Sequence, residues 1–285
     1  MGQSLDETGA ASVAPDLQQL KQRKEFNPTQ VEDALSNIRH SLARELPQFI
    51  PDPEPCKGSL ILVGGGPSMA NSLVTIRRMA ARNGARVIAF NDAIQYLLDR
   101  NVPVWGTVLM EVMSWQPESI KTVPKGLTYL VASEAHPDTY DMLLSAGANV
   151  VQWHAMEEIG EDRLIGDKFD GAVPLIPGGV TALTRAFFLG HAMGYRRVEL
   201  FGADSSHAEN VSHAYYHRSD SKVFDIYCAG KWFRAPGYLA RQCEDLTKIV
   251  QCHHGKTMNI RVHGTGMFPH VARALGVHAK PKDEE

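Results

Sequence analysis

The sequence predicts an α/β protein with a Rossmann-like, open, mostly parallel sheet and helices on both faces. Three observations support this fold class. The apolar run at 59–63 is short and continuous, as in strands that are buried on both faces. A glycine-rich turn follows it, and then an amphipathic segment with helical spacing. A second apolar run at 86–90 completes a strand–helix–strand unit, and such units are almost always right-handed and parallel.

The elements expected along the chain follow from hydrophobic period and from breaker residues. Met69, Leu73, Ile76 and Met79 share one helical face, and Gly84 can end that helix. The other predicted elements, in chain order, are a helix at 93–100, strands at 104–109, 127–131 and 149–152, a helix at 180–193, a strand at 197–201, a helix at 238–251 and a strand at 258–262. We expect the charged, glycine-punctuated segment 157–170 to be a surface loop.

Composition divides the chain into four parts. Residues 1–26 are expected to be a disordered or loosely packed tail, because they begin with a run of small and polar residues. Segment 27–55 is predicted to be an amphipathic helix, at 27–46, followed by a proline-rich connector. That helix would pack on the main domain at 56–270 or on a second subunit, which would make the protein a homo-oligomer. Residues 271–285 are expected to be a C-terminal tail.

Bulk properties exclude several classes of protein. With 285 residues and 44% hydrophobic content, the chain can form one large domain. A net charge of −3 does not indicate a nucleic-acid partner. No segment has the ~18–20 apolar residues that span a bilayer, and the start does not resemble a signal peptide. Four irregularly spaced cysteines favour a reduced, cytoplasmic location over a disulfide scaffold.

The turn after the first predicted strand has the properties of a phosphate site. Gly64, Gly65 and Gly66 let the backbone approach a ligand closely, and Pro67 suits the first turn of a helix. Ser68 adds a hydroxyl, and the free amides of the helix start attract anions. The turn lacks the Gly-Lys-Ser/Thr ending of a Walker A loop and the full dinucleotide fingerprint. A tight strand-to-helix turn without a ligand is the alternative interpretation.

Other candidate binding residues follow the ends of predicted strands. Parallel sheets bind ligands at this edge, near the point where the strand order reverses. Gly178 and Gly179 repeat the glycine device before a second helix and could clamp a diphosphate. Asn91, Glu111 and Asp204 offer amide and carboxylate groups to a sugar or a base. Ordinary turn residues are the competing interpretation for each of them.

A histidine- and tyrosine-rich segment follows the strand that ends before Asp204. It contains His207, His213 and His217 together with Tyr215 and Tyr216. Histidine is suited to proton transfer near neutral pH, so we place the catalytic base at His213 first and at His207 second. A zinc site and a solvated loop are the alternatives. The spacing does not supply a complete set of zinc ligands, and we predict no metal site here.

These motifs together resemble a known family. The turn 64–68, the strand end at Asn91, the Gly-Gly-Val-Thr segment at 178–181 and the run Val-Glu-Leu-Phe-Gly-Ala-Asp at 198–204 are similar to the 6-hydroxymethylpterin diphosphokinase MptE-like family. That family is related to the bacterial lipooligosaccharide sialyltransferases and to the motility-accessory-factor glycosyltransferases. The resemblance covers about 60–264. It implies a sialyltransferase-like variant of the Rossmann-like fold, of the GT-A type.

The resemblance also implies which residues surround the nucleotide. They are Gly65, Gly66, Ser68, Asn91, Glu111, Gly178 and Gly179. Two of them depart from the sialyltransferase pattern, because Gly65 and Glu111 stand where that branch has asparagine. Ser206 and His213 stand near the places of its tyrosines, and no residue near 234–236 matches its histidine base.

Domain 56–270 is therefore predicted to be a nucleotide-dependent transferase. The leading interpretation is glycosyl transfer from a nucleotide sugar to an unidentified acceptor hydroxyl, with backbone amides stabilising the departing phosphate. The second is a pyrophosphokinase with ATP as donor, whose Mg²⁺ would be held by Glu111 or Asp204. The third is a non-catalytic nucleotide-binding or assembly module. Metal dependence separates the first two, and turnover of a donor separates both from the third.

Overall fold

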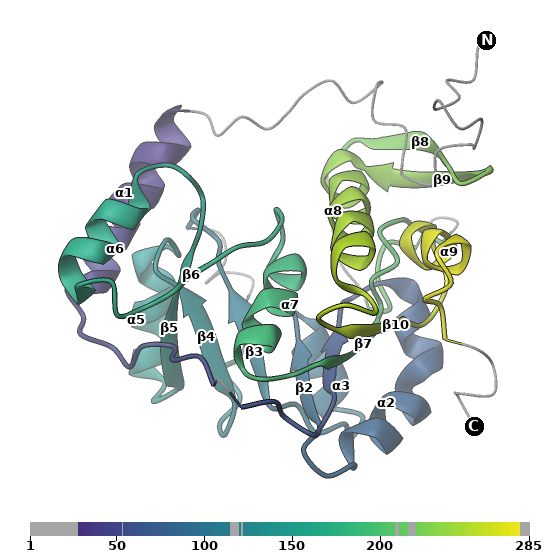
Figure 1. The fold of residues 1–285 in the computed structure, drawn as a ribbon, viewed down its shortest axis with the longest axis horizontal. Coiled ribbons are helices and arrows are strands. Elements are labelled where there is room, and N and C mark those ends of the chain that lie inside the picture. Colours follow the sequence, from purple (N-terminus) through teal and green to yellow (C-terminus); the bar gives the residue numbers. More distant parts are fainter. Residues whose placement is uncertain are drawn as a thin grey trace.

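A computed structural model describes residues 28–52, 54–114, 120, 122–208, 211–215 and 221–279. The predicted tail at 1–26 lies outside the described residues, and so do Tyr216 and His217. Within them the chain forms an eight-stranded, fully parallel sheet in the order β10-β7-β1-β2-β3-β4-β5-β6 (Figure 1). The predicted fold class is confirmed.

The predicted elements lie close to their expected ranges, and several further elements were not predicted from the sequence. The sheet strands are β1 (Leu60–Val63), β2 (Arg86–Ala89), β3 (Gly106–Leu109), β4 (Thr128–Ala132), β5 (Asn149–Ala155), β6 (Leu175–Ile176), β7 (Arg197–Phe201) and β10 (Asn259–Val262). The helices are α1 (Pro28–Leu42), the 3-10 helix η2 (Pro67–Ser72), α2 (Leu73–Ala80), α3 (Ala93–Leu98), α5 (Pro137–Ser145), α6 (Glu161–Phe169), α7 (Ala182–Ala192), α8 (Gly237–His253) and α9 (Met267–Ala274). A separate antiparallel hairpin is formed by β8 (Val223–Cys228) and β9 (Lys231–Pro236).

Each face of the sheet carries its own hydrophobic core. Successive side chains of a strand point to opposite faces, so Leu60 and Leu62 of β1 pack with α7, α8 and α9, whereas Ile61 and Val63 pack with α2, α3 and α5. All four side chains of β1 are fully buried. This two-sided burial explains why β1 is a continuous apolar run in the sequence.

Helix α1 covers the carboxyl ends of β3 and β4. Its Ile38 and Leu42 are buried against Ile165 of α6, so this apolar stripe is covered within the chain. Asn37 donates from Nδ2 to the carbonyl oxygens of Val112 and Glu134, at 3.0 Å each. The helix therefore joins the two loops that follow neighbouring strands.

The prediction of a surface loop at 157–170 is wrong, because α6 occupies most of this segment. The Glu161 carboxylate accepts hydrogen bonds from the amides of residues 157, 158 and 159, at 2.6, 2.9 and 2.8 Å. These bonds fix the start of the helix. Ile165 supplies its buried contact. One apolar turn in a charged segment gives too weak a period to be recognised from the sequence.

The expected boundary at 270 falls inside α9. Val271 and Ala272 are fully buried, and Val277 and Ala279 are nearly so. The amide of Ala279 donates to the carbonyl oxygen of Val262 at 2.9 Å. The packed part of the chain therefore continues through residue 279, and 271–279 is not a tail.

Candidate functional site

The strand order reverses between β1 and β7, and the loops after these two strands are in tight contact. Strands β2 to β6 lie on one side of β1, and β7 and β10 lie on the other. The amide of Gly66 donates to the carbonyl oxygen of Gly202 at 2.9 Å. A Cβ on Gly64 would lie 2.5 Å from the Gly202 oxygen, and a Cβ on Gly202 would lie 2.3 Å from the Gly64 oxygen. Glycine is thus required at both positions for the two loops to pack.

Ser68 and Asp204 bind each other beneath this contact. The Ser68 amide donates to Asp204 Oδ2 at 2.8 Å, and the Ser68 hydroxyl donates to Oδ1 at 2.5 Å. Both residues are buried. Burial raises the pKa of Asp204 to about 6, although the hydrogen bonds from Ser68 act in the opposite direction. The Asp204 carboxylate therefore accepts the hydrogen bonds of the Ser68 amide and hydroxyl, the two donors that were expected to bind phosphate.

Gly65 lies beneath the segment 211–215. The amide of Ala214 donates to the Gly65 carbonyl oxygen at 3.0 Å. A Cβ on Gly65 would lie 2.2 Å from Tyr215 Oη and 2.9 Å from His213 Cδ2. The amides of Gly64, Gly66, Ser68 and Met69 all donate within the chain. The amide of Gly65 differs from these, because it has no hydrogen-bond acceptor among the residues that the structure describes.

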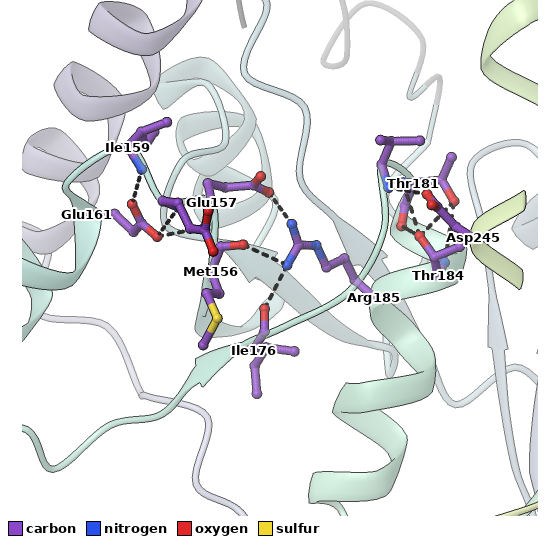
Figure 2. A network of polar contacts seen from close by, with 11 residues as sticks. Met156, Glu157, Ile159, Glu161, Ile176, Thr181, Thr184, Arg185 and Asp245 are labelled. Carbon is purple, nitrogen blue, oxygen red and sulfur yellow. Dashed lines mark hydrogen bonds and ion pairs between the residues drawn. The ribbon is translucent and has the colours of Figure 1, made fainter. Parts of the chain in front are cut away.

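The second glycine turn precedes α7 and is also bound by a carboxylate. The Val180 amide donates to Asp245 Oδ2 of α8 at 3.1 Å, and a Cβ on Gly179 would lie 2.3 Å from the same oxygen. Gly178 has a φ of +149°, and a Cβ there would lie 2.7 Å from Arg185 Cδ. Figure 2 shows Asp245 beside Thr181, which caps the helix. Burial raises the pKa of Asp245.

The loop after β7 connects the two glycine turns. Ser205 Oγ donates to Gln242 Oε1 at 3.0 Å, and Gln242 Nε2 donates to Thr181 Oγ1 at 3.3 Å. Ser205 is buried and has a φ of +52°, a conformation that non-glycine residues rarely adopt. Strain of this kind is concentrated at functional sites. The 204–205 segment thus contacts the first turn directly through Asp204, and it is linked to the second turn by the chain of hydrogen bonds from Ser205 through Gln242 to Thr181.

A row of glutamates follows the next strands along the same edge. Glu111, Glu134 and Glu157 each stand two residues after the end of β3, β4 and β5 respectively. Glu111 was expected from the sequence, whereas Glu134 and Glu157 were missed. Their common spacing after the strand ends was the signal that could have found them.

Glu134 is the most perturbed carboxyl group of this row. It is 3% exposed, and burial, followed by the charge of Glu157, raises its pKa to about 8. The Arg185 guanidinium opposes this shift. Arg185 forms an ion pair with Glu157 and donates to the carbonyl oxygens of Met156 and Ile176, at 3.1 and 2.8 Å (Figure 2). Burial therefore favours the neutral form of this carboxyl group at the edge of the sheet.

The predicted histidines lie in different surroundings. The His213 ring is tilted against Tyr215 with centroids 5.4 Å apart, and its Nδ1 is 3.0 Å from Ser212 Oγ. It lies directly over Gly65. The backbone amide of His207 donates to the Arg234 carbonyl oxygen of β9 at 2.8 Å. Burial and then the charge of Arg234 lower the pKa of His207. His213 is thus at the first glycine turn, and His207 is at the hairpin.

Tyr215 and Asn91 lie beside the end of β2. Burial raises the pKa of Tyr215, and the nearby Asp92 carboxylate adds to the rise. Asn91 is exposed and has a φ of +50°. Glu111 accepts a hydrogen bond from the Met113 amide at 3.2 Å. Of the predicted binding residues, the first glycine turn and Asp204 are in direct contact, and the second turn is linked to them through Gln242. Asn91 and Glu111 follow the neighbouring strands of the same edge.

Two further properties concern metals and membranes. In the part of the chain that the structure describes, no three His, Cys, Asp or Glu side chains are placed to hold a metal ion. Among the same residues, no helix has the length and apolarity that crossing a bilayer requires.

The fold is similar to that of a solved glycosyltransferase. The MAf glycosyltransferase from Magnetospirillum magneticum AMB-1 superposes with a TM-score of 0.60 at 15% sequence identity. The match covers 87% of this chain and 41% of that one, so this chain spans about two fifths of its neighbour. No protein-family model and no curated protein matches the chain. The neighbour shows that the fold is the α/β, Rossmann-like one expected from the sequence.

Proposed function

We propose that this chain is a nucleotide-dependent transferase that passes a sugar from a nucleotide-sugar donor to an acceptor hydroxyl. The observation that carries the proposal is that the 204–205 loop binds the first glycine turn directly and is linked to the second through Gln242, at the point where the strand order reverses. Ligands of open parallel sheets bind at such a point. The fold similarity to a glycosyltransferase and the sequence resemblance to the MptE-like family support the same interpretation.

The backbone amides of the two turns are assigned to the donor phosphates. Gly65 offers an amide without an acceptor among the described residues, and Gly178 and Gly179 stand before the N-terminus of α7. Amides and the helix dipole favour negative charge at such positions. Asn91 and Glu111 are assigned to the base or the sugars of the donor. Ser68 and Asp204, which bind each other, hold the first turn in place.

The reaction that follows exchanges one bond of the sugar for another. The acceptor oxygen forms a bond to the anomeric carbon, the bond from that carbon to the phosphate oxygen breaks, and the nucleotide leaves with both bonding electrons. The acceptor proton passes to His213, our first choice for the base, with His207 as the second. Donors at the two turns would stabilise the charge on the departing phosphate.

A screen of donors tests this proposal. We would measure thermal unfolding with cytidine, uridine, guanosine and adenosine nucleotides and their sugar conjugates, each with Mg²⁺ and with EDTA. A ligand at 100 times its Kd adds roughly 2.7 kcal/mol of stability. Stabilisation by a nucleotide sugar, with release of the free nucleotide when acceptors are added, supports the proposal. Selective stabilisation by ATP with Mg²⁺ would favour the pyrophosphokinase, and binding without turnover would leave a nucleotide-binding module.

A further inference from the structure

An open pocket lies at the amino ends of β7 and β10, on the edge of the sheet opposite the glycine turns. Its volume is about 640 Å³, which is within the range of pockets that hold small molecules. The last turn of α7, the residue that precedes β7 and the loop between α8 and β10 form its wall. Both glycine turns follow the carboxyl ends of strands, so this pocket is separate from the proposed donor site.

The pocket is lined by four basic residues and, within the described part of the chain, by no acidic one. The basic residues are His191, Arg196, His254 and Lys256. None of them forms an ion pair with a carboxylate among the residues that the structure describes. Asp52, on the connector beside the end of α7, accepts instead from the Glu54 amide, at 3.0 Å. The positive charge of the pocket therefore has no counterpart in the described chain.

Arg196 presents a guanidinium group that is held at one nitrogen. Its Nη1 donates to the carbonyl oxygens of His191 and Tyr195, at 2.8 and 3.0 Å. The first of these bonds satisfies a carbonyl group in the last turn of α7, where a free carbonyl would repel an anion. Nε and Nη2, which share the opposite edge of the guanidinium, have no acceptor among the described residues. Two parallel donors of this kind suit two oxygens of one phosphate.

The two histidines add a directed donor and show that the surroundings are positive. His254 Nδ1 accepts a hydrogen bond from the Ile260 amide at 3.0 Å, so its ring carries the proton on Nε2. Within the described chain, Nε2 has no acceptor. Burial, and then the charges of Arg196 and His253, lower the pKa of His191. Both charged groups that act on His191 are thus cations, as expected where an anion would bind.

The loop between α8 and β10 is held in one shape before any ligand binds. The His253 carbonyl oxygen accepts from the amides of residues 256, 257 and 258, at 3.1 Å each. Gly255 has a φ of +73°, and its amide donates to the Met258 carbonyl oxygen at 2.9 Å. Lys256 is exposed on this loop, with Nζ 3.4 Å from the Gln251 carbonyl oxygen. A fixed loop loses little conformational entropy on binding, and Lys256 gives up only one long hydrogen bond to reach an anion.

The charges and the rest of the wall favour a phosphate ester of a polar compound. A phosphomonoester carries a charge of about −1.5 to −2 near pH 7, and Arg196 and Lys256 match it with two positive charges, whereas a carboxylate carries only one negative charge. The exposed residues Thr257 and Asn259 also line the pocket. No aromatic residue of the described chain does. This wall suits a compound with hydroxyl groups better than it suits a nucleobase.

We propose that this pocket binds the phosphate group of a small phosphomonoester, such as a sugar phosphate. Arg196 bonds to two phosphate oxygens through Nε and Nη2, His254 donates to the phosphate from Nε2, and Lys256 neutralises the remaining charge. The site is at the opposite edge of the sheet from the glycine turns, so it goes beyond the proposed function and does not depend on it.

The histidine ring signals in NMR spectra of the full-length protein test the proposal. We expect the signals of His191 and His254 to shift to saturation with glucose 6-phosphate, and acetate at the same concentrations to leave them in place. The double variant Arg196→Gln/Lys256→Gln should lose about tenfold or more in affinity for glucose 6-phosphate. Arg82→Gln/Lys125→Gln makes the same charge change at two exposed residues elsewhere and should bind as the wild type does.

A single variant keeps the test decisive if the double variant is unstable, because Arg196 also binds two carbonyl groups of the chain. Lys256→Gln changes an exposed side chain and should keep the wild-type melting temperature. Its affinity for glucose 6-phosphate should fall about threefold. Unchanged affinity in folded Lys256→Gln, unmoved histidine signals in the wild type, or equal affinity for acetate would each overturn the inference.

Phosphate binding at the first glycine turn is distinguished by a further variant. If Gly65→Val loses affinity for glucose 6-phosphate while Arg196→Gln/Lys256→Gln keeps it, the phosphate binds at that turn and the inference is rejected. The opposite pattern supports the pocket. Binding of nucleotide sugars is measured separately by calorimetry. Failure of the donor to bind would reject the proposed function alone, because the histidine signals report on the pocket whether or not a donor binds.

Discussion

The Asp204 carboxylate accepts both hydrogen-bond donors of Ser68, at 2.8 Å from its amide and 2.5 Å from its hydroxyl. Asp204 follows β7 and Ser68 follows β1, so this bond closes the two loops at the centre of the sheet. It changes the role expected for Ser68. A residue predicted to bind phosphate holds the shape of the turn, and the phosphate contacts are left to backbone amides.

Ser68→Ala should destabilise the fold. The substitution leaves a buried carboxylate with one of its two hydrogen bonds, which costs about 1–3 kcal/mol. Denaturant unfolding measures the change. Ser72→Ala is the control, because Ser72 is on the same 3-10 helix and donates a longer bond, of 3.3 Å, to the Ser68 carbonyl oxygen. Equal stability of the two variants would mean that the Ser68–Asp204 bond does not hold the loops together.

Asn37→Ala should also lower the free energy of unfolding. It removes the amide that donates to the half-buried carbonyl oxygen of Val112 and the buried one of Glu134, and leaving the buried group unpaired costs about 1–3 kcal/mol. The neighbouring exposed Ser36→Ala should have almost no effect. Chemical denaturation of both variants tests this. A neutral Asn37→Ala would show that α1 does not fix the loops after β3 and β4.

Glu134→Gln should change the dependence of stability on pH. The pKa of Glu134 is raised to about 8 in the folded state, above its ordinary value of 4.5. Its contribution to stability is therefore complete below about pH 4.5 and is lost as the pH rises through about 8. Glutamine cannot ionise, so the stability of the variant relative to the wild type should increase as the pH rises from 5 to 9. The assignment is contradicted if the difference in melting temperature between the variant and the wild type stays constant from pH 5 to pH 9. The exposed Glu158→Gln is the control.

His213→Asn should lower turnover by ~10²–10⁴-fold while the affinity for the donor stays nearly constant. The acidic limb of the pH–rate profile should disappear, because the base that titrates there is absent. The same kinetics on His207→Asn serve as the comparison. If His207→Asn shows this pattern and His213→Asn does not, the base is His207. If neither histidine substitution matters, EDTA stops the wild-type reaction and Glu111→Gln cripples it without EDTA, the pyrophosphokinase interpretation replaces the present one.

The fold could be predicted because its strands are buried on both faces and its turns are rich in glycine. Strand β1 and the turn after it were identified on those grounds alone. Helix α6 was missed because its single buried contact, Ile165, leaves no helical period. The hairpin β8–β9 was missed although its side chains alternate between core and solvent. Its turn residues, Ala229 and Gly230, both have positive φ, but Ala-Gly is not one of the residue pairs that mark such turns in a sequence.

Of the candidate site, the loops that follow the strand ends could be predicted from the sequence, but the contacts between them could not. Parallel strand ends meet at one edge, so the loops of Gly65, Gly178 and Asp204 were expected at the same edge of the sheet. The sequence could not show that Asp204 binds the first glycine turn and Asp245 the second. These contacts join residues that are 136 and 65 positions apart. The buried state of Glu134 likewise depends on Glu157 and Arg185. Such three-dimensional neighbours leave no local pattern in a single sequence.

The central claim is that the turn at Gly65 binds a nucleotide donor, and calorimetric titration of Gly65→Val tests it most directly. A Cβ on Gly65 would lie 2.2 Å from Tyr215 Oη and 2.9 Å from His213 Cδ2, which are outer atoms of side chains that can rotate aside, so the protein should still fold. Gly166→Val is the matched control, because a Cβ there meets no atom within 4 Å. We predict that wild type and Gly166→Val bind the nucleotide sugar found in the screen, whereas folded Gly65→Val shows no heat of binding. Wild-type affinity in folded Gly65→Val would contradict the account.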